Sequence, residues 1–202
     1  MITIENMLSI DKGDLPKAAK ELNKDDIPQL VEWLSLKNDA IRYQAFLLLQ
    51  SRSQFYDDVY PYWNTFCHKL KSDNSYQRSL GLMLMAENAK WDSEGRMEIT
   101  IDEYLELLND EKPITVRQCI QSLGKIVTHK PGLSEKIAGR LISFDFLSVK
   151  ETMRKSILLD ILNVLLLVRK GLKTDAAEGF IRIALSGDVL DKKSKKQIET
   201  YL

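Results

Sequence analysis

The sequence predicts an all-α protein, built as a right-handed α-solenoid of about four to five helix pairs. Three observations favour this class: apolar residues recur at three-to-four-residue spacing, Gly and Pro stand chiefly between the apolar runs, and one pattern repeats along the chain. Alternation of apolar and polar residues never lasts beyond a few positions, so no β-strand is expected. A single helix pair cannot cover both of its apolar faces, and we therefore expect neighbouring pairs to stack.

The repeating pattern is anchored on four arginines at intervals of 36, 39 and 37 residues: Arg42, Arg78, Arg117 and Arg154. Twelve residues before each arginine stands a large apolar residue, and another follows three or four positions later, as the first helix of a pair requires. Three and seven residues after each arginine, small or apolar residues predominate. This spacing predicts a second helix in every repeat.

We expect one domain over residues 1–202, with a cap at each end. Residues 1–24 form the expected N-terminal cap, and a short helix is predicted from Asp14 to Lys24. Four helix pairs occupy residues 25–170. Residues 171–202 predict a degenerate fifth pair, about Thr174 to Ser186 and Asp188 to Leu202, which closes the other end with a lysine-rich segment.

Capping residues mark where these helices begin. Each first helix is expected to start at residues that complement its positive end: Asp25–Asp26, Asp57–Asp58, Asp102–Glu103 and Ser134–Glu135. Three second helices follow an N-cap oxygen or a first-turn proline, at Asn38–Asp39, Asn74–Ser75 and Lys112–Pro113. The fourth second helix has only Ser148 nearby.

Helix pairs of this period, whose second helix opens with Asp or Asn and then carries an apolar–Arg step, resemble HEAT repeats. Ile41–Arg42, Val116–Arg117 and Met153–Arg154 carry that step, whereas Gln77–Arg78 departs from it. The resemblance covers roughly residues 25 to 170, and the run from Asp73 to Arg117 also looks similar to uncharacterised bacterial HEAT-like proteins. It implies an armadillo-like architecture and leaves the activity open.

The charge balance and the cysteine content limit the classes of partner and compartment. Lys plus Arg and Asp plus Glu each total 29, so no global attraction to nucleic acid or anionic membrane is expected. The longest apolar stretch, Ile157 to Val168, is interrupted by Asp160 and Asn163 and is too short to span a membrane. Two cysteines and a start without a secretion signal favour a cytoplasmic protein.

Two interpretations compete for the four repeat arginines. They either tie helix pairs together by bonding carboxylates or helix-end carbonyls, or line a surface that grips phosphate or an acidic peptide. The structural interpretation is favoured because the overall charge is nil.

Two interpretations also compete for the six aromatic residues from Phe55 to Phe66. Inter-repeat packing is favoured. Tyr60, Tyr62 and Trp63 are nevertheless candidate anchors for a partner, since they cannot all point inward from one helix start.

No catalytic, metal-binding or cofactor-binding motif is expected. Cys67–His68, Cys119 and His129 lack the spacing that places two metal ligands on one helix face, and no glycine-rich phosphate loop or nucleophile elbow is present. The resulting hypothesis is a non-catalytic scaffold or adaptor for another protein or peptide, of unknown oligomeric state. The alternative is a DNA-binding protein resembling HEAT-like DNA alkylation repair glycosylases, for which Trp91–Asp92 is the pair that invites comparison.

Overall fold

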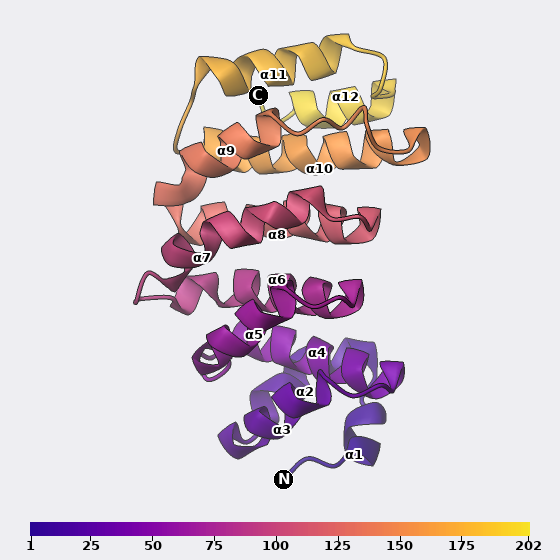
Figure 1. Ribbon diagram of the computed structural model, residues 1–202, viewed down its shortest axis with the longest axis vertical. Coiled ribbons are helices and arrows are strands. Elements are labelled where there is room, and N and C mark those ends of the chain that lie inside the picture. The colour runs from indigo at the N-terminus through magenta and orange to yellow at the C-terminus, as the bar shows by residue number, and fades with distance from the viewer. The chain divides into compact units, whose positions relative to one another are not determined.

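The computed structural model describes residues 1–202, and every regular element in it is a helix (Figure 1). The predicted absence of strands is confirmed. The α-helices are α1 Ile4–Leu8, α2 Leu15–Glu21, α3 Ile27–Trp33, α4 Asp39–Ser53, α5 Trp63–Leu70, α6 Ser75–Asn88, α7 Arg96–Leu105, α8 Pro113–His129, α9 Ser134–Ile142, α10 Glu151–Arg169, α11 Asp175–Ser186 and α12 Lys192–Glu199. Short 3₁₀ turns join several of them, and no helix has both the length and the hydropathy to cross a membrane.

The chain forms two compact units, Met1–Met97 and Glu98–Leu202. In the first unit α2 and α3 pack on α4, α5 packs on α6, and α4 contacts α6. In the second unit the longest helices, α8 and α10, form the most extensive packing, and α9 and α11 lie against α10. In both units, therefore, the second helices of two consecutive predicted pairs pack on one another: α4 on α6, and α8 on α10.

The helices expected over residues 25–170 occur in the predicted order, α3 and α4, α5 and α6, α7 and α8, and α9 and α10, and α11 and α12 follow them. The predicted caps are also found where second helices begin: Asn38 Oδ1 accepts from the Ala40 and Ile41 amides, Asn74 Oδ1 accepts from the Tyr76 amide, and Pro113 opens α8. Helix α1 was not expected from the sequence.

Two of the predicted helix starts are wrong. Asp102–Glu103 lies inside α7, which begins at Arg96 because Asp92 accepts hydrogen bonds from the Arg96 and Met97 amides at 2.9 Å each. Asp57–Asp58 precedes α5 by several residues, because the Asp58 carboxylate is buried against Arg52 rather than exposed at a helix end. In both cases a carboxylate has a tertiary partner that local sequence does not reveal.

A glycine sets the separation of α5 and α6. A Cβ atom at Gly81 would lie 2.6 Å from the Phe66 carbonyl oxygen and 2.9 Å from Lys69 Cβ, both on α5. Because no side chain fits in this space, the two helices approach at Gly81 more closely than other residues would permit. This contact fixes the position of Lys69 relative to α6.

Candidate functional site

Three of the four repeat arginines bond main-chain oxygens in the loop between the two helices of their own pair. Arg42 Nη1 donates to the Leu36 carbonyl at 3.3 Å, and Arg78 Nη1 donates to the Ser72 carbonyl at 2.8 Å. Arg154 Nε donates to the Val149 carbonyl at 3.2 Å. Carbonyls at the end of a helix have no intrahelical donor. Each guanidinium therefore donates to a loop carbonyl that would otherwise be hydrogen-bonded only by water.

Arg117 has a different partner. Its Nε donates to Asp160 Oδ2 on α10 at 2.7 Å, and Gln121 Nε2 donates to Asp160 Oδ1 at 3.0 Å. Asp160 stands six residues after Arg154, at the position where the other three repeats have the fully buried leucines Leu48, Leu84 and Leu123. In the sequence, the indication of this ion pair is an aspartate at a repeat position where the other three repeats have leucine.

Two of the three candidate aromatic anchors are buried. Tyr60 is 8% exposed and Trp63 is 1% exposed, with their rings in an edge-on contact 5.8 Å apart. Neither side chain is available to a partner, because the 3₁₀ turn before α5 directs both into the core of the first unit. Tyr62 is half-buried, and burial raises the pKa of its hydroxyl, with a smaller effect from Asp58.

Buried polar bonds hold this aromatic region. The Tyr60 hydroxyl donates to Asp92 Oδ1 at 2.7 Å, and desolvation together with that carboxylate raises the pKa of Tyr60 to about 12. Trp91 Nε1 donates to the Ser53 carbonyl at 2.7 Å. Trp91 and Asp92, the pair that invited comparison with glycosylases, therefore bond groups within the first unit.

Arg52 and Asp58 form a buried ion pair that no sequence pattern indicated. Arg52 donates from Nε and Nη2 to the Asp58 carboxylate, and its Nη1 donates to the Ala19 carbonyl at 2.9 Å. Both side chains are buried, so the pair is desolvated and fully hydrogen-bonded. Through its bond to the Ala19 carbonyl, Arg52 also connects α4 to α2.

A pocket of about 530 Å³ opens in the first unit between the α3–α4 loop and the α5–α6 pair; we call it the basic loop pocket. Its lining includes no carboxylate. The lining residues are Ser35, Leu36, Lys37, Arg42, Thr65, His68, Lys69, Ser72, Asn74 and Gln77.

Lys69 is the buried cation of this pocket. The residue is 8% exposed, and its ammonium donates to Ser35 Oγ at 3.0 Å and to Gln77 Oε1 at 2.5 Å. Gln77 in turn donates to the Leu34 carbonyl at 2.8 Å. Because both partners of the ammonium are neutral, desolvation lowers the pKa of Lys69, and the nearby Arg42 adds to that effect.

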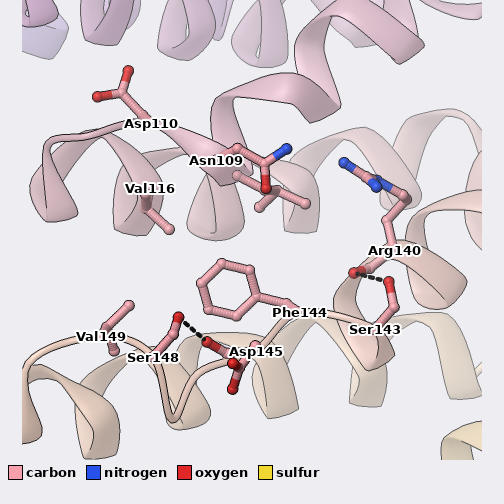
Figure 2. A pocket seen from close by; sticks show the side chains of 10 residues that line it. Asn109, Asp110, Val116, Arg140, Ser143, Phe144, Asp145, Ser148 and Val149 are labelled. Carbon is pink, nitrogen blue, oxygen red and sulfur yellow. Dashed lines mark hydrogen bonds between the residues drawn. The ribbon is translucent and has the colours of Figure 1, made fainter.

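A second pocket, of about 410 Å³, lies in the other unit between the α7–α8 loop and the α9–α10 loop; we call it the mixed loop pocket. Figure 2 shows the Phe144 ring in the middle of this pocket, with the side chains of Asp110 and Arg140 on opposite sides of it. Ser148 Oγ donates to the Asp145 carbonyl at 2.7 Å, which holds the loop beneath the ring. The pocket therefore offers one apolar surface surrounded by charges of both signs.

The two pockets occupy corresponding positions in the repeat. Counting back from Arg78 and Arg154, Ser72 corresponds to Ser148, His68 to Phe144 and Lys69 to Asp145. The fold thus builds a pocket in the same register in each unit, and the side chains give the two pockets different chemistry.

The cysteines and histidines do not gather. Cys119 is buried, its thiol contacts the Tyr104 carbonyl at 3.7 Å, and desolvation raises the pKa of that thiol above its ordinary value, with a smaller effect from Asp110. No group of three or more His, Cys, Asp or Glu side chains has a geometry that could hold a metal ion.

Comparison with protein-family models and with curated proteins finds no match to this sequence.

Proposed function

We propose that the chain is a non-catalytic protein-binding scaffold, in which HEAT-like helix pairs stack as a right-handed α-solenoid and hold segments of another protein. The packing of α4 on α6 and of α8 on α10 supports stacking, because second helices of consecutive pairs pack on one another in HEAT-like arrays. A repeated architecture presents similar binding positions along the chain, and sequence differences between repeats then set what each position recognises.

The observation that carries this proposal is the recurrence of a loop pocket in the same register of each unit. In the mixed loop pocket, Phe144 is half-buried and offers an aromatic surface of the kind that dominates protein interfaces. Asp110, Asp145 and Arg140 at its rim provide charged groups that can orient a bound segment.

Selection of peptides from a random display library against the full chain tests the proposal. Binding of the selected peptides is then measured calorimetrically with wild type, with Phe144→Ala and with Ile183→Ala. Ile183 is an apolar residue on α11, outside the pocket and 72% exposed, so it is the matched control. We expect Phe144→Ala to weaken binding about tenfold or more, since a central aromatic anchor is worth about 2 kcal/mol, and Ile183→Ala to leave it unchanged.

Selected peptides whose affinity does not change with Phe144→Ala would contradict a role for this pocket. Arg140→Glu is a second variant, on helix α9 rather than in the loop, and it guards against a loss that merely reflects a disturbed loop. It should alter the preference of the pocket for charged residues in the peptide while the far-ultraviolet circular dichroism stays the same.

The DNA-binding hypothesis gains no support from its candidate pair. A catalytic aspartate needs a carboxylate that faces the substrate, whereas Asp92 accepts bonds from the Tyr60 hydroxyl and from two main-chain amides at the start of α7. Trp91 likewise donates to a main-chain carbonyl of the first unit.

A further inference from the structure

A buried ammonium without a counter-ion is energetically unfavourable unless something compensates for its lost hydration. Lys69 is such a group: more than nine-tenths of the residue's surface is buried, and Ser35 and Gln77, its two partners, are neutral. An ammonium has three N–H donors, and these two bonds use two of them. One donor therefore remains for a group in the basic loop pocket.

The surroundings of Lys69 add positive charge. Lys37 lies exposed at the rim, and the Arg42 guanidinium also lines the pocket. Arg42 already pairs with the exposed carboxylate of Asp39. Its Nε has no acceptor, and the guanidinium stacks on the Tyr76 ring 4.2 Å from the centroid.

The charge count indicates the class of ligand. Asp39 offsets Arg42, which leaves Lys37 and Lys69 as two cations without a carboxylate in the lining. Two positive charges match a phosphate monoester, which carries about −1.5 to −2 at neutral pH, better than a single carboxylate or a phosphodiester. Ser72, Thr65 and Asn74 supply neutral polar groups at the same surface.

We propose that the basic loop pocket is a binding site for a dianionic phosphoryl group, with Lys69 as its buried cation and Lys37 as its exposed one. The phosphoryl group compensates for the desolvated ammonium and accepts its third N–H. This inference goes beyond the scaffold proposal, because free phosphate binds at the site whether or not the chain holds a protein partner.

Calorimetric or ³¹P NMR titration of the full chain with inorganic phosphate tests the proposal. We expect saturable binding to one site in wild type, about tenfold weaker or absent in Lys69→Met, because a charge-assisted hydrogen bond is lost. Lys37→Met removes a solvated charge at no cost to the core, and it should weaken binding severalfold. Lys17→Met is the matched control, since Lys17 is an exposed lysine of the same unit outside the pocket, and it should bind as wild type does.

Further titrations define the ligand. Dimethyl phosphate, a monoanion, should bind more weakly than inorganic phosphate, and a phosphoserine peptide that binds more tightly than inorganic phosphate would assign the phosphoryl group to a protein partner. Equal affinity of the two would assign it to free phosphate or a small phosphate ester. The proposal is overturned by an absence of saturable phosphate binding, by unchanged binding in both Lys69→Met and Lys37→Met, or by dimethyl phosphate binding as tightly as phosphate.

Discussion

At the scale of single residues, the contacts of Arg117 and Asp160 lead to unequal predictions for the two partners. Asp160 is buried in a column of leucines, whereas Arg117 is partly exposed. Removing the arginine leaves a desolvated carboxylate, but replacing the aspartate by leucine restores the side chain that the other repeats have there.

We therefore expect Arg117→Ala to lower the free energy of unfolding by about 1–2 kcal/mol, and Asp160→Leu to leave it unchanged or raise it. Urea denaturation followed by circular dichroism measures both variants. If the two changes destabilise the protein equally, the bond between Arg117 and Asp160 is not what holds this position together.

Tyr60 makes the stability of the protein depend on alkaline pH. Its folded-state pKa is raised from 10.0 to about 12, so between these values the folded protein keeps a phenolic proton that the unfolded chain releases. Stability from this group is complete below pH 10 and falls as the pH rises toward 12. Tyr104 is fully buried, and desolvation raises its pKa as well, so it contributes a fall of the same sign.

Tyr60→Phe should make the decline of unfolding free energy above pH 10 shallower. At neutral pH the same variant should be about 1 kcal/mol less stable, because Asp92 loses a hydrogen bond from a side chain. Denaturation midpoints measured from pH 8 to pH 11 compare the variant with wild type. An identical alkaline slope in the two proteins would show that Tyr60 does not titrate in this way.

At the scale of elements, the close approach of α5 and α6 depends on Gly81. Gly81→Ala places a Cβ 2.6 Å from a main-chain oxygen, which cannot move without shifting α5, and we expect a loss of at least about 1 kcal/mol. The matched control is Gly139→Ala on α9, where a Cβ meets nothing within 4 Å. That change should stabilise the protein by about 0.5–1 kcal/mol, since alanine favours a helix more than glycine does. Thermal unfolding of both variants checks the pair, and destabilisation of similar size in each would contradict the packing.

Local sequence predicted most of the helices because it contains both the apolar period and the caps. Asn38, Asn74 and Pro113 act at the helix starts within a few residues, so their effect is readable without tertiary structure. The start of α7 was misplaced because Asp92 caps it from a turn that also bonds Tyr60, 32 residues earlier in the chain. An acidic pair inside a helix, Asp102–Glu103, carries the same local signal as a helix start; Asp102 instead bonds Lys136 on α9 at 2.8 Å.

The candidate site was less predictable than the helices, because it depends on contacts between residues that are far apart in the sequence. The sequence left open which of Tyr60, Tyr62 and Trp63 would be exposed, because the burial of Tyr60 and Trp63 depends on how the turn before α5 packs in the first unit. Lys69 stands near the end of an amphipathic helix, where a lysine usually points to solvent. Its burial follows from Ser35 in the α3–α4 loop and from the glycine at position 81, neither of which a local pattern connects to Lys69.

At the scale of the whole molecule, the balance of 29 basic and 29 acidic side chains sets an expectation for nucleic acids. A groove that holds duplex DNA neutralises many phosphates, and its affinity then falls steeply with salt. We expect no salt-sensitive binding of duplex DNA at micromolar concentrations of the protein in low salt. Fluorescence anisotropy with a labelled duplex measures this, and a steep decrease of affinity between low and moderate salt would favour the DNA-binding hypothesis instead.

Hydrogen exchange of the full chain, with and without a peptide selected by display, tests the proposed scaffold role most directly. If the loop pockets hold partner segments, the peptide should slow exchange in residues 106–116 and 140–151 around the mixed loop pocket, or in residues 34–42 and 65–77 around the basic one. Protection confined to helices remote from both pockets, or no protection at saturating peptide, would contradict the account.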